Sequence, residues 1–155
     1  MVSIGEQVGR ETIAVITDMD EPLGAAVGNA LEVREAVETL RGRGSKDLEE
    51  LCLDLGGYML MLGRKAESIE QGRIVLKKLI ESGDAFEKLK QIVKAQGGNP
   101  DVIEHPEKLP AARRILTVES ADEGYVSRIA AESIGAAAMM LGAGRATKDA
   151  EIDLP

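Results

Sequence analysis

The amino-acid sequence predicts an α/β fold, which for these 155 residues taken alone amounts to an α+β arrangement. A continuous β-branched run at residues 12–16 predicts one buried strand. Glycine-bounded stretches with apolar residues three and four positions apart predict about four helices in series over residues 26–96. Two short β-branched runs after residue 110 predict a small β-hairpin, which a further helix follows.

The first elements are a helix end and a strand. Residues 2–9 have the apolar spacing and the closing glycine of a helix that is ending. The run TIAVI at residues 12–16 lacks polar alternation, which is expected of a strand buried on both faces. Pro22 and Gly24 then interrupt the pattern, so we expect a loop before the first full helix.

Glycines separate the four helices that follow. Ser45 is a candidate N-cap for the second helix, and Ser68 with Gln71 has the spacing of a capping box for the third. Asp84 opens the fourth in a similar way. The four helices are predicted within residues 28–41, 45–63, 68–83 and 84–97.

A proline-rich stretch at residues 99–110 predicts an extended connector. Beyond it, residues 114–118 and 125–130 predict two strands, and residues 133–141 a helix rich in small side chains. We therefore divide the chain into one domain at residues 1–110 and the start of a second at 111–155. A single strand and an isolated hairpin cannot form a stable sheet, so we expect either partner strands from elsewhere or helices that form a bundle of their own. An unstarted helix at the front and an unpaired β unit at the back predict a chain that is part of a longer protein.

Composition narrows the classes of function. The chain carries 27 acidic and 19 basic side chains, a net charge of −8, and this surface repels nucleic-acid backbones and anionic lipid. Only two Tyr and one Phe are present, which is too few for a base-stacking surface. No apolar run approaches the ~20 residues of a membrane-spanning helix. We expect no nucleic-acid or membrane partner.

Cys52 is the only cysteine, so no internal disulfide can form, which fits a cytoplasmic protein. It lies among Leu51, Leu53 and Leu55 with no histidine close in sequence. A buried, inert thiol is therefore favoured over a nucleophile.

Three side chains are candidates for acid–base or metal chemistry. His105, the only histidine, lies in the proline-rich connector, where a solvated loop histidine is favoured over a general base. Asp18 and Asp20 follow the predicted strand, the place where α/β proteins hold their sites. They could bind a metal or move a proton, but we favour a solvated turn.

Two glycine-rich segments are candidates for ion binding. Residues 142–147 (GAGRAT) follow a helix instead of preceding one, so we interpret them as a helix stop and not as a phosphate cradle. Residues 24–28 precede a helix and are the better anion candidate, although they offer no lysine. Carbonyls before a helix can also bind a hard cation together with a carboxylate, and Glu32 or Glu35 is close enough in sequence to supply it.

Two long segments resemble one enzyme family. Residues 16–48 (ITDMDEPLGAAVGNALEVREAVETLRGRGSKDL) resemble the signature region of the pyrimidine-nucleoside and thymidine phosphorylases. Residues 124–155 (GYVSRIAAESIGAAAMMLGAGRATKDAEIDLP) resemble the start of that family's C-terminal domain. The resemblance covers essentially the whole chain. Anthranilate phosphoribosyltransferase shares the broader fold but lacks the second segment.

The resemblance implies a cytoplasmic, dimeric pentosyltransferase that cleaves thymidine- or uridine-type nucleosides with inorganic phosphate, yielding the free base and a pentose 1-phosphate. The family's phosphate loop (Lys-His-Ser-Thr-Gly-Gly type) and its base-binding Arg, Ser and Lys motif do not occur in this sequence. The resemblance therefore implies no catalytic or substrate-binding residue here, and a chain that is inactive alone. Residues 1–110 correspond to the latter α/β domain and 111–155 to the first part of the C-terminal domain.

One family site falls within the sequence. Some members bind K⁺ near the phosphate loop, and part of that shell corresponds to the backbone carbonyls of Leu23 and Ala26 and the carboxylate of Glu35. The remaining ligands belong to the phosphate loop. If this is correct, the helix should begin after Ala26, which leaves both carbonyls outside the helical hydrogen-bond ladder.

A rival interpretation is a non-catalytic module for dimerisation or partner binding. Unpaired strands and an incomplete β unit expose apolar surface and backbone groups that favour association.

Overall fold

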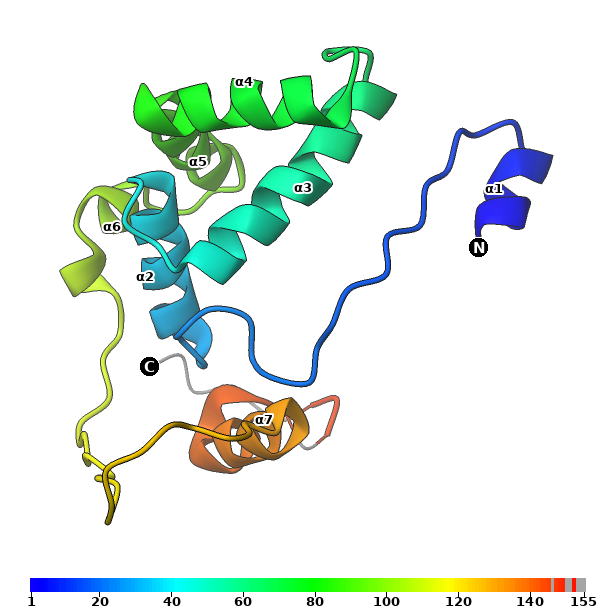
Figure 1. Ribbon diagram of the computed structural model, residues 1–155. Helices are drawn as coiled ribbons and strands as arrows, with labels where there is room; N and C mark the ends of the chain where they lie inside the picture. Colours follow the sequence, from blue (N-terminus) through cyan, green and yellow to red (C-terminus); the bar gives the residue numbers. More distant parts are fainter. Residues whose placement is uncertain (146, 150–151, 153–155) are drawn as a thin grey trace.

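The computed structural model describes residues 1–145, 147–149 and 152. The described residues form helices joined by extended segments (Figure 1). In chain order the elements are α1 (Val2–Gln7), α2 (Asn29–Leu40), α3 (Lys46–Leu62), α4 (Ile69–Glu81), α5 (Asp84–Ala95), α6 (Asp101–Glu104), the 3₁₀ helix η1 (Pro106–Lys108), α7 (Ala131–Ala138) and the π-helical turn η2 (Met139–Ala143).

The α/β class and its α+β variant are wrong for the part of the chain that the structure describes, because it contains no strand. Residues 12–16 run as an unpaired extended segment, and Ile16 is 98% exposed where a buried strand was predicted. Residues 114–118 and 125–130 are likewise unpaired, so the hairpin is wrong too. A strand needs a neighbour for its backbone N–H and C=O groups, and no described segment supplies one.

The four serial helices are confirmed as α2 to α5, close to the predicted limits. At the start of α4 the Ser68 hydroxyl accepts from the Gln71 N–H at 3.2 Å, as the capping box predicted. The Gln71 side chain returns to the N–H of Glu67 at 2.6 Å and not to that of Ser68. Ser45 does cap α3 by position, but its hydroxyl lies 3.4 Å from Glu35 and bonds there instead.

Helices α3 and α4 cross at a pair of buried glycines (Figure 1). A Cβ added to Gly72 would lie 2.9 Å from the Cα of Gly57, and one added to Gly57 would lie 2.9 Å from the carbonyl oxygen of Ile69. Only hydrogen at these two positions allows the backbones to approach so closely. Arg73 of α4 closes the crossing from outside through ion pairs with Glu50 and Asp54 of α3.

The core is small and centres on α2. Val37 is fully buried, and the other apolar side chains classed as buried are Ala30, Leu53 and Ile103. Arg41, one turn beyond Val37, lies 4.8 Å from the centre of the Phe86 ring of α5. The helical core, residues 29–109, is thus held by few buried side chains and by polar contacts around them.

The prediction of an extended connector is wrong for most of residues 99–110, which form α6 and η1. Two arginines, one within α2 and one at its C-cap, hold this segment. Arg41 donates to the carbonyls of Ile103 and Glu104 at 3.4 and 2.9 Å, and Arg34 to those of Pro106 and Leu109 at 3.1 and 3.4 Å. The last carbonyls of these short helical turns have no partner within the turn, and the two arginine side chains supply the missing donors.

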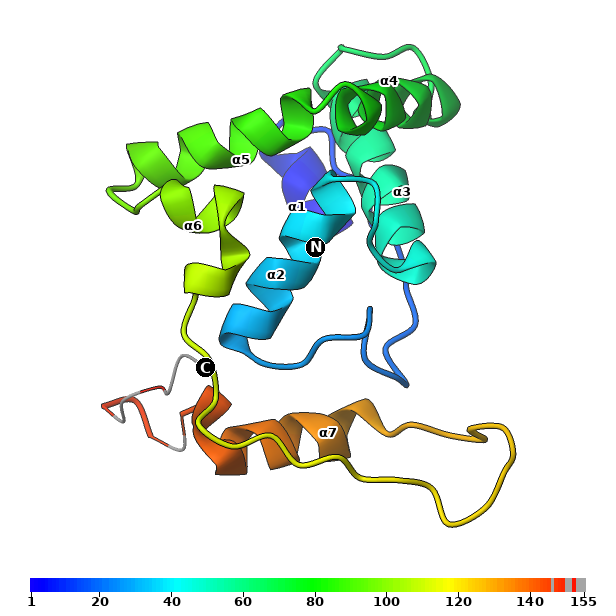
Figure 2. The ribbon, with the colours of Figure 1, turned by 90° about the vertical axis from the view of Figure 1, so that its left-hand side faces the viewer.

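The last helix packs against the loop before α2 (Figure 2). The predicted helix over residues 133–141 is confirmed as α7 continued by η2, and Gly142 ends it with a φ of 105°. The Ala131 N–H donates to the carbonyl of Asp20 at 3.1 Å, and the Asn29 side chain donates to the carbonyl of Ala143 at 3.1 Å. Of the segment 142–155, residues 146, 150–151 and 153–155 lie outside the described part, and the division at residue 110 stays a prediction.

Candidate functional site: a carboxylate-held loop

Three carboxylates hold the loop that precedes α2. The Gly24 N–H donates to Asp47 at 2.8 Å, and the Gly28 N–H donates to Glu32 at 3.0 Å. Between them, the N–H groups of residues 25 and 26 donate to the two oxygens of Glu35 at 2.8 and 3.1 Å. The N–H groups of residues 24, 25, 26 and 28 are thus occupied by the chain's own carboxylates, which argues against anion binding at this loop.

Gly24 is required where the loop meets Glu35. Its φ of 75° is in the left-handed region, which side chains rarely adopt. A Cβ there would also lie 2.6 and 2.8 Å from the two carboxylate oxygens of Glu35. A larger residue at position 24 would therefore displace the Glu35 carboxylate from the amides of Ala25 and Ala26.

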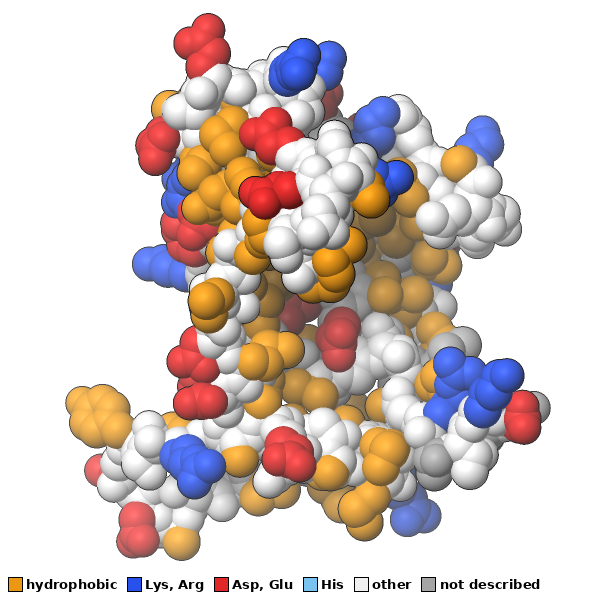
Figure 3. All heavy atoms as spheres, turned by 90° about the vertical axis from the view of Figure 1, so that its right-hand side faces the viewer, with side chains coloured by type: hydrophobic (Ala, Val, Ile, Leu, Met, Phe, Trp, Pro, Cys, Tyr) orange, Lys and Arg blue, Asp and Glu red, His pale blue; other side chains and the backbone are white. Residues whose placement is uncertain are grey.

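The structure brings the three predicted cation ligands to one hollow. Leu23, Ala26 and Glu35 all line a cavity of about 400 Å³. Figure 3 shows this face of the molecule hollowed, with apolar side chains around the hollow and acidic side chains inside it. Its further lining comes from the loop, α2, α3 and α7, and consists of Met19, Pro22, Val27, Glu32, Ala36, Leu48, Ala131, Ile134 and Gly135.

The helix start agrees with the prediction. Regular helix begins at Asn29, and the first bond of its ladder runs from the Glu32 N–H to the Gly28 carbonyl at 2.8 Å. The carbonyls of Leu23 and Ala26 therefore lie outside the ladder. Oε1 of Glu35 accepts the Ala25 N–H and the Ser45 hydroxyl, whereas Oε2 accepts only the Ala26 N–H and keeps the second of its two acceptor positions. The donor set fits a hard cation: two loop carbonyls and one carboxylate beside a cavity.

Side-chain clusters that could hold a metal ion by themselves are not found among the described residues. Within the described residues there is no group of three or more His, Cys, Asp and Glu side chains arranged to hold a metal ion. The predicted site at the loop is different, because two of its three ligands are backbone carbonyl oxygens and only one is a side chain.

Asp47 is the functional candidate that sequence reasoning missed. It lies in the first turn of α3, where a carboxylate suits the positive end of the helix and needs no further role. In the structure the Gly24 N–H is the main cause that lowers the pKa of Asp47, and the Ser45 hydroxyl and the Leu48 N–H lower it further. No local signal could reveal this contact, because 23 positions separate the two residues.

The remaining acid–base candidates lie apart from the hollow. His105 is exposed between α6 and η1, with Nδ1 3.2 Å from Glu107 and Nε2 3.9 Å from Asp101, a surface position that agrees with the solvated-loop interpretation. Asp18 and Asp20 are exposed, and the Asp20 N–H donates to Asp18 at 2.8 Å in a tight turn, as favoured. The Asp20 carbonyl has a structural role, because it receives the N–H of Ala131.

The prediction that Cys52 is buried is wrong: its side chain is exposed on α3. Successive residues of a helix are 100° apart, so Cys52 points outward while its neighbour Leu53 is only 3% exposed. The sulfur is still partly covered by its neighbours, and this partial burial raises the pKa of the thiol. A raised pKa keeps the thiol protonated and unreactive at neutral pH. An inert thiol is therefore still favoured over a nucleophile, because of its raised pKa and not because it lies in the core.

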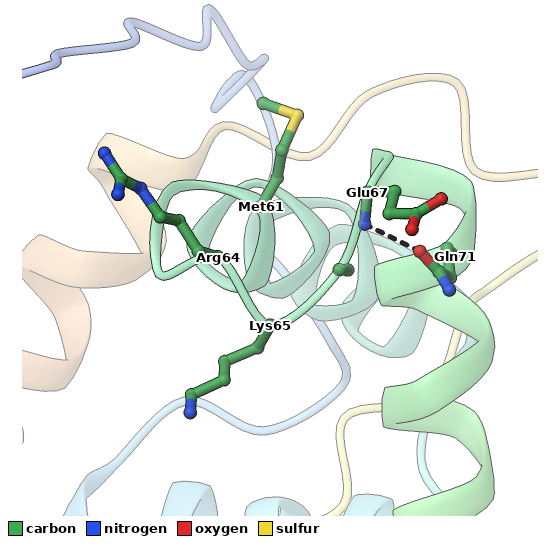
Figure 4. Close-up of a pocket in the computed structure, with 6 residues that line it drawn as sticks. Met61, Arg64, Lys65, Glu67 and Gln71 are labelled. Carbon is green, nitrogen blue, oxygen red and sulfur yellow. Dashed lines mark hydrogen bonds between the residues drawn. The ribbon is translucent and has the colours of Figure 1, made fainter.

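A second hollow, of about 470 Å³, lies at the turn between α3 and α4 (Figure 4). It is lined by Met61, Arg64, Lys65, Ala66, Glu67 and Gln71. Figure 4 shows Arg64 and Lys65 directed apart, so their charges do not converge on one point. The cavity has no set of side chains that could bind a ligand jointly.

No helix in the described part of the chain is both long and apolar enough to cross a membrane.

Comparisons with known proteins agree with the two segments singled out in the sequence. A glycosyl transferase family model, for the a/b domain, matches residues 1–86, and a model of the pyrimidine nucleoside phosphorylase C-terminal domain matches residues 125–155. The chain is 52% identical over 154 residues to the pyrimidine-nucleoside phosphorylase of Geobacillus stearothermophilus. The same identity over the same length holds for the enzymes of Staphylococcus aureus strains RF122 / ET3-1 and USA300.

These alignments cover 99% of this chain and 36% of each relative, so the chain spans about a third of the length of the curated relatives it matches. The family resemblance is thereby confirmed along the whole chain, and its two matched segments occur in the expected order. The chain belongs to the glycosyl transferase family represented by this a/b domain and, within it, corresponds to part of a pyrimidine-nucleoside phosphorylase.

Proposed function

We propose that this chain forms part of an enzyme that cleaves pyrimidine nucleosides with inorganic phosphate. The observation that carries the proposal is the 52% identity over 154 residues to proteins named pyrimidine-nucleoside phosphorylase. In the reaction a phosphate oxygen bonds to the anomeric carbon of the pentose, while the bond from that carbon to the base nitrogen breaks and its electrons leave with the base. The proton of the hydrogen phosphate passes to the base nitrogen, so the products are the free pyrimidine and a pentose 1-phosphate.

The chain's own contribution is a scaffold, a wall near the cleft and part of a K⁺ site. Leu23, Ala26 and Glu35 line one cavity, and two backbone carbonyls with one carboxylate would be a donor set that suits a hard cation. A bound cation would add positive charge close to the phosphate that the enzyme uses as co-substrate. Three oxygens are an incomplete shell, so the chain alone should bind K⁺ weakly and the longer protein should bind it more tightly.

An activity measurement tests the enzyme assignment. The 155-residue chain alone should not release thymine or uracil from thymidine or uridine, because its sequence lacks the phosphate-loop and base-binding motifs. A chimera should release base in a phosphate-dependent way when this chain replaces its aligned segment in the Geobacillus stearothermophilus relative. A stable, folded chimera without activity would contradict the proposal, and so would activity of the chain alone.

Glu35 provides the matched test of the K⁺ contribution. In the same chimera Glu35→Gln keeps the size of the side chain and removes its charge, so K⁺ should activate or stabilise it far less than the parent chimera. Glu49→Gln, on the first turn of α3, is the charge-matched control and should keep the K⁺ response. Equal responses in all three proteins would rule out the cation role.

We also propose that the longer protein is a cytoplasmic homodimer, as the resemblance to the family implies. One observation favours the rival interpretation, a non-catalytic association module: apolar side chains of the extended segments are exposed. Ile16, Leu116, Val118 and Tyr125 are all at least 87% exposed. A stable dimer of the purified chain in sedimentation, together with an inactive chimera, would favour that module over the enzyme.

A further inference from the structure

We propose that Asp47 is a positioning residue that orients the Leu23 carbonyl of the loop. This inference rests on the proposed function, because it assigns a role within the proposed cation site. The carboxylate of Asp47 accepts the Gly24 N–H at 2.8 Å, and it comes from α3, a different element from the one that carries Glu35.

The geometry of the peptide bond connects Asp47 to the carbonyl. The N–H of Gly24 and the C=O of Leu23 belong to the same planar, trans peptide unit, so they point in opposite directions. An N–H held by Asp47 therefore fixes a carbonyl that points away from Asp47. Leu23 lines the hollow and Asp47 does not, which agrees with this division between the two sides of the peptide.

The Asp47 carboxylate lies on a well-supported helix. It is in the first turn of α3, where the Ser45 hydroxyl and the Leu48 N–H, like the Gly24 N–H, favour its charged form and lower its pKa. That helix is long, at 17 residues, and it packs against α4 through the close glycine crossing. The orientation of the peptide between residues 23 and 24 is thus set by the rigid helical core and not by the loop alone.

The two predicted carbonyl ligands are positioned by different groups. Glu35 takes the N–H of Ala26 and Glu32 takes the N–H of Gly28, so the peptides on both sides of the Ala26 carbonyl are held from α2. The Leu23 carbonyl depends on Asp47 of α3. Removing the Asp47 carboxylate should therefore release one carbonyl and leave the other in place.

The test uses the 155-residue chain, with K⁺ as the probe and choline replacing it at constant ionic strength. Carbonyl and amide chemical shifts of residues 23–28 are recorded by nuclear magnetic resonance without and with K⁺. Asp47→Ala should increase hydrogen exchange at the Gly24 amide, shift the Leu23 carbonyl signal and weaken K⁺ binding about tenfold, the equivalent of one charge-assisted hydrogen bond. The Ala26 carbonyl signal should stay unchanged.

Two further variants separate positioning from charge and from folding. Asp47→Asn keeps an acceptor oxygen and should restore most of the Gly24 protection and of the K⁺ affinity. Glu49→Ala removes a neighbouring charge from the same helix turn and should behave as the wild type. A circular dichroism spectrum unchanged from the wild type shows that α3 is intact in every variant.

The outcomes distinguish this inference from the proposed function. If Asp47→Ala leaves both the Gly24 amide and K⁺ binding unchanged while Glu35→Gln abolishes binding, Asp47 has no positioning role and the cation site stands. If Glu49→Ala weakens K⁺ binding as much as Asp47→Ala does, the effect is one of charge and the inference is overturned. If the wild-type chain shows no response to K⁺ at residues 23–28, the proposed cation role fails and the inference fails with it.

Discussion

Apolar residues are frequent both in the helical core and in the two extended segments, which contain residues 12–16 and 114–130, but only those of the core become buried. Both are rich in apolar residues, but Val37 of the core is fully buried while Ile16 and Leu116 of the extended segments are 98% and 87% exposed. A helix satisfies its backbone hydrogen bonds within itself, so α2 to α5 form from local sequence. A strand depends on a neighbour, and the described residues of this chain offer none.

The comparison separates a region whose residues are buried or bonded within the chain from segments that are unpaired and exposed. Changes in the core should alter the stability of the 155-residue chain. Changes in the extended segments should alter its association with the rest of a longer protein and leave the chain itself nearly unaffected.

The largest effect is expected at the α3–α4 crossing. Gly72→Val would place side-chain atoms against the backbone of Gly57 and should destabilise the chain by about 3 kcal/mol, the upper range for overpacking. The measurement is urea unfolding followed by circular dichroism. Gly135→Ala is the control, because a Cβ at that helical position meets nothing within 4 Å, and it should be neutral or stabilising. Equal losses in both variants would show that the crossing has no special role.

A smaller effect is expected where the core holds the connector. Arg41→Met keeps a long side chain but removes the donors to the carbonyls of Ile103 and Glu104, and should cost about 1–2 kcal/mol. Hydrogen exchange should rise in α6 and η1 and much less in α3. Arg43→Met is the control, because Arg43 bonds only to the exposed carboxylate of Glu38, and it should change stability by less than about 0.5 kcal/mol.

Acidification should loosen the same connector. Lys90 lowers the pKa of Glu104, and Lys108 lowers the pKa of Asp101. A carboxyl group whose pKa is lower in the folded chain stabilises that chain above the ordinary carboxyl range, so this contribution is lost as the pH falls below about 4. The urea midpoint should therefore fall between pH 5 and pH 3, and the fall should be smaller in high salt, which screens such exposed pairs. A midpoint independent of pH would contradict it.

The smallest effect on the chain itself is expected in the extended segment. Ile16→Ser should change the free energy of unfolding by less than about 0.5 kcal/mol, because the side chain is 98% exposed. In the chimera with the Geobacillus stearothermophilus relative, we expect the segment to pair with a neighbouring strand, so the same change should lower thermal stability there. A chimera that is insensitive to Ile16→Ser would mean that the segment stays unpaired in the longer protein too.

The same contrast explains what could be predicted from the sequence. Helices α2 to α5 were predicted close to their observed limits, because capping residues and glycine stops act over a few positions. Helices α6 and η1 were not, because the arginines that hold them lie between 62 and 75 positions away. The strands were wrong for a similar reason: their propensity is local, but pairing is not.

In the candidate site, too, local features could be predicted from the sequence and contacts between distant residues could not. Spacing alone left Glu32 and Glu35 as equal candidates, and the family resemblance selected Glu35 and the carbonyls of Leu23 and Ala26. The helix start after Ala26 was predictable, since Gly24 and Gly28 break the pattern locally. The Asp47 contact and the wall that α7 contributes were not, because both come from distant parts of the chain.

The hydrogen bond from Asn29 to Ala143 joins residues 114 positions apart, which has a consequence for the order of folding. Closing so large a loop carries an entropic cost that contacts between sequence neighbours avoid, so α2 to α5 should assemble first and α7 should dock last. During synthesis the wall of Ile134 and Gly135 emerges after every other part of the cavity lining. The hollow beside Leu23 should therefore be completed only at the end of folding, so that a nascent chain has a formed loop but an unfinished cavity.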